Sequence, residues 1–299
     1  MRSNDFSKIV GEFEKLATGT SGGKSYEDNR FWTPTVDKAG NGSALIRFLP
    51  NVEGDEFPWV RIYSHSFQGP TGKWYIENSL STIGENDPVG ELNSRLWNSG
   101  SEENKKIASK QKRKTSYIAN IVVLNDPAKP ENNGKVFLFK FGKKIFDKIM
   151  DKARPTFEDE KPVLVFDLWE GANFKLRIRQ VEGFRNYDKS EFESQSELAG
   201  GDDADLQAIV DQQHKLAEFL NRDKNFKTYD ALKKRLDEVL SGTSAPTKSA
   251  AKMADDEDLG SFAAPEIKST PAPAAKSKPA VMDDDDEDAL SYFQKMAQD

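Results

Sequence analysis

The stretch KQKRKTSYIANIVVL, residues 110–124, joins a block of cations to a long run of strand-forming residues. Four of its first five residues are Lys or Arg, although the whole chain of 299 residues carries a formal net charge of −7. The surrounding segment, residues 105–148, holds 12 basic and 3 acidic side chains. Such a distribution bears on binding partners rather than on fold, and it favours an anionic partner.

Short apolar runs continue on both sides of this stretch, from residue 31 to residue 190. Turns rich in Gly, Pro and Asn separate them, a pattern typical of β-strands in a small barrel or sandwich. The expected strands are SALIRFLP, VRIYSHSF, KWYIE, SYIANIVVL, KVFLFKF, VLVFDLW and FKLRIRQV. Residues 84–109 are polar and predict a loop or a helical insertion, whereas residues 203–240 repeat apolar residues at helical spacing. A mainly β fold with helical additions is therefore expected.

The two ends of the chain differ from this middle part. Residues 6–17 predict a short amphipathic helix that docks either on its own core or on another molecule. After Ser241 the sequence is rich in Ala, Pro, Ser and Lys and then turns acidic, which predicts disorder. Near the end, Leu290, Phe293 and Met296 would form one apolar edge of a helix. This edge favours a docking peptide over a purely solubilising tail.

Like the stretch at residues 110–124, two further expected strands carry cations beside aromatic residues. In FKLRIRQV, residues 174–181, alternation places the apolar residues on one face and the three cations on the other. In KVFLFKFGKK, residues 135–144, three phenylalanines share a face and Lys140 points the opposite way. Single-stranded nucleic acid requires this combination, because cations track its phosphates while exposed rings stack on its bases.

A barrel also needs apolar filling, so that not every ring can face a ligand. Phe137, Phe141 and Phe174 are expected in the core. Tyr117 and Tyr187 are better candidates for stacking, since a phenol tolerates water at its edge.

Other functional classes find little support. The chain has no cysteine, which excludes disulfides and thiolate chemistry. GTSGGKS, residues 19–25, has only three residues between its first glycine and GK, one too few for a phosphate-binding loop, and it follows no apolar strand. His65 and His214 lie far apart without a matching carboxylate motif, so neither a zinc site nor a histidine-based nucleophile is indicated. Because no catalytic motif is found, an enzyme is not expected. Without an 18-residue apolar run or a secretion signal, a cytosolic protein is expected.

Several longer motifs resemble the replicative single-stranded DNA-binding protein of T-even-type tailed phages. They are KRKTSY, NDPAKPENNGKVF, FGKKIFDKI, GNGSALIRFLP, GKWYIE, WEGANF and GFRNYD, in matching order through residues 30–190. The resemblance implies an OB-fold-like small barrel core with a DNA cleft and a helical C-terminal part, residues 21–241. It also implies an N-terminal cooperativity segment, residues 1–20, and a disordered acidic tail that binds replication and recombination partners, residues 242–299.

The same resemblance implies which residues contact DNA. The arginine of IRFLP is Arg47, and Phe139 stands where the family has a tyrosine in a later strand. The full expected set for single-stranded DNA is Arg47, Lys112, Arg113, Lys114, Tyr117, Phe139, Lys140, Lys143, Lys144, Arg177, Phe184 and Tyr187. Partner proteins are expected at Leu290, Phe293 and Met296.

Two departures from the family pattern matter. Relatives hold a structural zinc through one histidine and three cysteines, whereas here His65 remains but no cysteine follows. Zinc is therefore expected to be absent, and no cofactor is expected, with apolar packing by Leu80, Ile83 and Leu92 in its place. The N-terminus also lacks the family's basic cooperativity motif, so that cooperativity would be weaker or would rest on residues 6–17.

The expected function is sequence-nonspecific, cooperative binding of single-stranded DNA during phage replication, recombination and repair. The protein would act in the cytoplasm of the infected bacterial host, self-associate along DNA and have no membrane partner. Two alternatives stay open: an RNA-binding regulatory module, and an acidic adaptor that recruits replication proteins through its tail.

Overall fold

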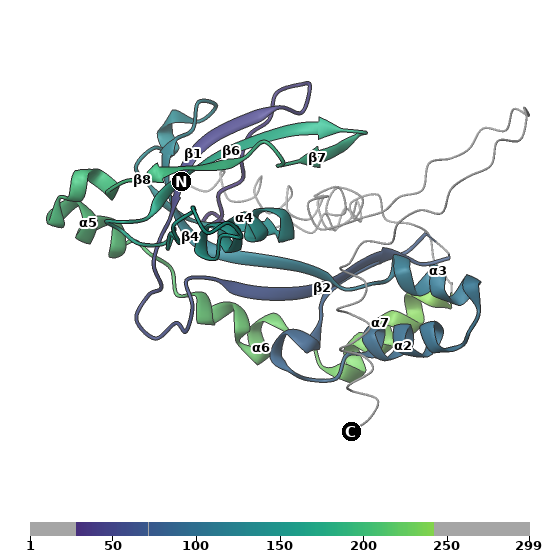
Figure 1. The fold of residues 1–299 in the computed structure, drawn as a ribbon. Helices are drawn as coiled ribbons and strands as arrows, with labels where there is room; N and C mark the ends of the chain where they lie inside the picture. The colour runs from purple at the N-terminus through teal and green to yellow at the C-terminus, as the bar shows by residue number, and fades with distance from the viewer. Residues whose placement is uncertain (1–27, 71, 242–299) are drawn as a thin grey trace, which may run out of the picture. The chain divides into compact units, whose positions relative to one another are not determined.

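The computed structural model describes residues 28–70 and 72–241 (Figure 1). The helix expected at residues 6–17 and the tail edge of Leu290, Phe293 and Met296 lie outside these ranges. Within them the chain forms a curled half-barrel sheet with added helices, which confirms the expected mainly β fold class.

The stretch that contains the cation block supplies the central strand. This strand, β4 (Lys114–Asn125), pairs antiparallel with β1 (Gly42–Phe48), β2 (Val60–Gln68) and β5 (Val136–Gly142). Residues 114–118 of β4 pair with β2, and residues 121–125 pair with β1. The long strand β4 therefore connects β2 to β1 within the sheet.

The remaining strands extend the two sides of the sheet. The strand order is β3-β2-β4-β1-β6-β7, and the pairs along it are antiparallel. The added strands are β3 (Trp74–Asn78), β6 (Ala172–Val181), β7 (Phe184–Asn186) and β8 (Glu191–Gln195), of which β8 pairs with β6.

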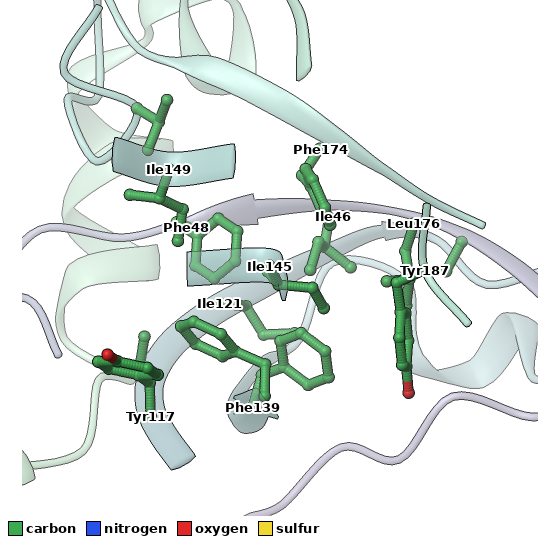
Figure 2. Close-up of a cluster of buried hydrophobic side chains, with 14 of the residues drawn as sticks. Ile46, Phe48, Tyr117, Ile121, Phe139, Ile145, Ile149, Phe174, Leu176 and Tyr187 are labelled. Atoms are coloured by element: carbon green, nitrogen blue, oxygen red, sulfur yellow. The ribbon is translucent and has the colours of Figure 1, made fainter. Parts of the chain in front are cut away.

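The inward face of this sheet builds the main core (Figure 2). Figure 2 shows side chains from β1, β4, β5, β6 and helix α4 (Lys143–Ala153) pointing toward one another. Phe48 is fully buried, and its ring centroid lies 5.5 Å from that of Phe141 and 5.8 Å from that of Phe174. The core positions expected for Phe141 and Phe174 are confirmed, and Phe137 is partly buried against the same cluster.

Residues 80–110 form helices, so the helical insertion was the correct alternative. The 3₁₀ helix η1 (Leu80–Ile83) is followed by α2 (Pro88–Asn98) and α3 (Glu102–Lys110). Asp87 caps α2 by accepting from the backbone N–H groups of Val89 and Gly90. A carboxylate before a proline in the first turn is a strong start signal for a helix.

A second core joins this helical insertion to the end of the described chain. Helix α7 (Tyr229–Leu240) packs Leu232, Leu236 and Val239 against Leu80 and against side chains of β2 and β3. The approach is close, because a Cβ at Gly69 would clash with the carbonyl oxygen of Val239.

The C-terminal helical region is broken into short pieces. It comprises α5 (Asp203–Val210), the 3₁₀ helix η4 (Leu216–Leu220), α6 (Arg222–Asn225) and α7, while η2 (Pro130–Asn132) and η3 (Leu198–Gly201) lie in earlier loops. None of the helices described in residues 28–70 and 72–241 is long and apolar enough to cross a membrane.

Candidate nucleic-acid interface

The cation block lies at the junction between α3 and β4. Helix α3 ends at Lys110 and is capped by Gln111, a buried residue whose carbonyl oxygen accepts from the Asn93 amide at 3.0 Å. The chain then turns into β4, so that Lys112 and Arg113 are exposed and Lys114 is half-buried. The predicted cations therefore lie on the surface beside the helical insertion.

Arg113 is held in place by two contacts on this surface. Its guanidinium carbon lies 3.7 Å from the ring centroid of Tyr63, and its Nη1 donates to Ser81 Oγ at 2.9 Å. The same ring has the guanidinium of Arg61 at 5.0 Å. Arg61 and Tyr63 belong to no recognised motif, but alternation along VRIYSHSF places both on one face of β2.

Tyr117 is buried in the core rather than exposed for stacking, which corrects the expectation from its phenol. Only 7% of its surface is accessible, and its ring lies parallel to that of Phe146 from α4, with 3.9 Å between the centroids. Burial raises the pKa of its phenol, because the phenolate is poorly solvated there. Figure 2 shows Tyr117 at one end of the core.

Phe139 and Tyr187 are also buried, as part of the same core. Phe139 packs edge-on against Trp32, with 5.4 Å between the ring centroids. Neither ring offers a face to a base in this conformation. Phe184, on the β6–β7 hairpin, is half-buried.

Arg47 is fully buried and serves the interior of the protein. Its Nη2 donates to the carbonyl oxygens of Asp167 and Ser196, each at 2.8 Å, and its Nη1 donates to Asn173 Oδ1 at 3.1 Å. Burial lowers the pKa of this guanidinium. Because its donors bind loop carbonyls, the side chain ties β1 to the segments around β6 and β8 and is not presented to a phosphate.

The alternation expected for β6 is confirmed, but carboxylates neutralise its cationic face. Lys175 pairs with Glu193 at 2.9 Å, and Arg179 pairs with Asp188. Arg177, a member of the expected set, lies 3.8 Å from Glu191. The side-chain hydrogen bond from Lys175 lowers the pKa of the Glu193 carboxyl. Acids on β8 and on the β7–β8 turn therefore reduce the attraction of this face for an anion.

The other expected cations lie on β5 and α4. Lys143 and Lys144 are exposed at the first positions of α4, whose N-cap Gly142 provides no side-chain cap. A helix start of this kind attracts anions, although Lys143 also pairs with Asp147 at 3.0 Å. Lys140 is exposed on the face of β5 opposite to the core phenylalanines. The structure thus does not place Lys140 on the face that carries Tyr117.

An aromatic pair with one exposed member, Phe57, lies next to the core ring stack. Phe57 is 50% exposed and stacks on Trp59, with 5.5 Å between the centroids. Trp59 in turn meets Phe146 edge-on at 5.5 Å, and Phe146 covers Tyr117. Rings therefore continue from the core to the surface at the start of β2. The sequence signal was FPW, residues 57–59, just before the strand.

The sequence of this chain matches one family of known proteins. Residues 40–240 match the family described as gp32 DNA binding protein like. The single-stranded DNA-binding protein of Enterobacteria phage T2 is 43% identical over 264 residues, covering 84% of this chain and 85% of that protein. The protein of the same name from Enterobacteria phage T4 is 44% identical over 248 residues, covering 79% and 80%. This chain belongs to the gp32-like DNA-binding family.

In this gp32-like protein, residues 28–70 and 72–241 do not surround His65 with the four ligands that a structural zinc requires. His65 is buried, with Nδ1 3.0 Å from the carbonyl oxygen of Gln111 and Nε2 3.3 Å from Asp87 Oδ1. A carbonyl oxygen only accepts, so Nδ1 is the donor in that bond. The part of the chain that the structure describes holds no group of three or more His, Cys, Asp or Glu residues able to bind a metal ion.

The residues expected to replace the metal do pack together. Leu80 is fully buried, and Ile83 and Leu92 are partly buried against the second core. Asp87 contributes more than apolar packing, since its Oδ2 also accepts from the Leu80 N–H at 3.1 Å. Burial alone would raise the pKa of the Asp87 carboxyl, yet the hydrogen bond and charge of His65 and the backbone donors hold it at about 2.

Proposed function

We propose that this chain binds single-stranded DNA without sequence preference, along the edge where β2, β4 and α4 meet. One observation carries the proposal: the exposed Arg113, at the entry to β4, lies with its guanidinium carbon 3.7 Å from the ring centroid of Tyr63 on β2. Cations track phosphates, and each base stacked on an aromatic ring contributes about 1–3 kcal/mol. The names of the relatives from phages T2 and T4 support the same ligand.

Within the expected set, Lys112, Arg113 and Lys114 are the primary phosphate contacts, and Lys143 and Lys144 extend the path at the start of α4. Arg177 and Phe184 on β6 and β7 contribute less, because carboxylates accompany the β6 cations. Phe57 replaces Tyr117, Phe139 and Tyr187 as the ring available for stacking, because Trp59 is itself covered by Phe57 and Phe166.

Tryptophan fluorescence titration of the full-length protein with poly(dT) and with duplex DNA, at several salt concentrations, tests this function. We expect tight binding to the single strand, weak binding to the duplex, and a log–log salt slope of about 0.7 per phosphate neutralised. Flat titrations with both would leave the acidic adaptor as the better account. A strong preference for RNA of equal length would favour the RNA-binding alternative.

The wider biological role is part of the same proposal. A protein that coats single strands serves phage replication, recombination and repair inside the infected bacterial cell, and it gains from self-association along DNA. Deleting residues 1–18 tests the cooperative part: binding to long strands should become less cooperative while affinity for a short oligonucleotide stays the same. Unchanged cooperativity would remove that role from the N-terminal segment.

The proposed function requires no metal. The chain has no cysteine, and both ring nitrogens of the buried His65 already face protein oxygens, Gln111 O and Asp87 Oδ1. Elemental analysis of the purified protein should find no stoichiometric zinc, and a chelator should leave its melting temperature unchanged. Bound zinc lost together with folded structure would overturn this.

A further inference from the structure

Two arginines share one tyrosine ring at the edge of the sheet. The guanidinium carbon of Arg113 lies 3.7 Å from the ring centroid of Tyr63, and that of Arg61 lies 5.0 Å from it. Arg61 and Arg113 are exposed and Tyr63 is half-buried. We call these three residues the Tyr63 cluster.

The fold explains why the three side chains meet. Arg61 and Tyr63 are two residues apart on β2 and therefore share a face. In the register with β4, Arg61 lies opposite Tyr117 and Tyr63 lies opposite Thr115, and Arg113 comes just before that strand. The Tyr63 cluster thus lies on the same face of the sheet as the main core, which begins at Tyr117 on β4. At the cluster this face is exposed to solvent.

The charges of the cluster are not balanced by acids. Among residues 28–70 and 72–241, neither Arg61 nor Arg113 forms an ion pair, and the hydrogen-bond partner of Arg113 is the neutral hydroxyl of Ser81. The cations of β6 each have a carboxylate nearby, as does Arg30, which also lies over a ring. Two like charges at one ring repel each other, and an anion between or beside them would offset this repulsion.

We propose that the Tyr63 cluster is a preordered binding site for backbone phosphates of single-stranded DNA, with one phosphate at each guanidinium. The proposal rests on the proposed function and adds Arg61 and Tyr63 to its site. Guanidinium groups suit phosphate because they offer paired donors in a plane. Tyr63 acts as a positioning residue: its ring restricts both side chains before DNA arrives, which lowers the entropy lost on binding.

The test compares full-length variants in poly(dT) titrations over a range of salt. Arg61→Gln and Arg113→Gln should each reduce the log–log salt slope by about 0.7, which is about a fivefold loss of affinity at 0.1 M salt. The double variant should lose about twice that slope. Arg61→Lys and Arg113→Lys keep the charge and should retain the slope of the unchanged protein.

Tyr63 and Arg30 supply the matched comparisons. Tyr63→Leu should weaken binding while leaving the salt slope unchanged, whereas Tyr63→Phe should bind normally. Arg30→Gln removes an arginine that also lies over a ring but is paired with Asp28 at 2.8 Å, and it should change neither quantity. Circular dichroism confirms that each variant is folded.

The outcomes separate this site from the general function. If the unchanged protein binds poly(dT) tightly and the folded double variant shows the same salt slope, the Tyr63 cluster is not a phosphate site. If the unchanged protein does not bind poly(dT) at all, the proposed function itself is wrong.

Discussion

At the residue scale, the ring of Tyr117 belongs to the packing of the core. It lies parallel to the ring of Phe146 and is buried beside Phe141. We expect Tyr117→Ala to lower the free energy of unfolding by about 3–5 kcal/mol, the usual cost of removing a buried aromatic side chain. Tyr117→Phe should cost less than about 1.5 kcal/mol, because the ring remains in place.

Urea denaturation measures both variants, and Phe184→Ala is the control. Phe184 is only half-buried on β7, so its removal should destabilise the protein much less. A Tyr117→Ala variant as stable as the unchanged protein, but with weaker DNA binding, would show that the ring leaves the core to stack on a base.

The residues that sequence analysis misplaced are covered by segments far along the chain. Alternation identifies the face of a strand on which a side chain lies, but it does not say what covers that face. Phe146 covers Tyr117 from a later helix, and the carbonyl acceptors of Arg47 lie 120 and 149 residues away at Asp167 and Ser196. Such partners have no local signal.

At the element scale, six of the seven expected strands form, but the expectation for VLVFDLW, residues 163–169, is wrong. Among the described residues this segment has no strand partner, and it supplies Val163, Val165 and Phe166 to the core from an irregular loop. The alternation of residues 174–181 and the turn NDPAKPENNG are local signals, and both appear in the structure as expected.

The polar composition of residues 84–109 is compatible with either a loop or a helix. The start signals were nevertheless present, since Asp87 precedes Pro88 and Ser101 caps α3.

The cap of α2 gives a pH-dependent prediction. The pKa of the Asp87 carboxyl is held at about 2 in the folded protein and would return to about 4 on unfolding. A lowered folded-state pKa stabilises the protein above pH 4, and this contribution, about 2 kcal/mol, is lost as pH falls from about 4 to about 2. Asp87→Asn should therefore destabilise the protein at neutral pH and make its stability less dependent on pH in that interval.

Chemical denaturation at several pH values between 2 and 7 measures this difference. Glu85→Gln is a control in the same loop, since Glu85 is exposed and pairs with Arg222 at the surface. If the free energy of unfolding of Asp87→Asn falls between pH 4 and pH 2 as much as that of the unchanged protein, then His65 and the backbone donors of α2 do not lower the pKa of the Asp87 carboxyl.

At the scale of the whole molecule, the two signs of charge are separated along the chain. Residues 105–148 hold 12 basic and 3 acidic side chains, whereas residues 242–299 hold 6 basic and 12 acidic ones. Residues 242–299 therefore carry net negative charge, which the cations of the proposed interface attract. They belong to the same chain as that interface. DNA and this segment should therefore compete for the same cations.

Truncation after Ser241 should consequently raise the affinity for poly(dT) at low salt, and the gain should shrink as salt screens the charges. Titration of the truncated and full-length proteins at several salt concentrations measures this. A full-length variant with Leu290, Phe293 and Met296 changed to alanine keeps every charge, so its DNA affinity should equal that of the unchanged protein. If that variant instead binds DNA as tightly as the truncated chain, apolar docking rather than charge holds the tail against the interface.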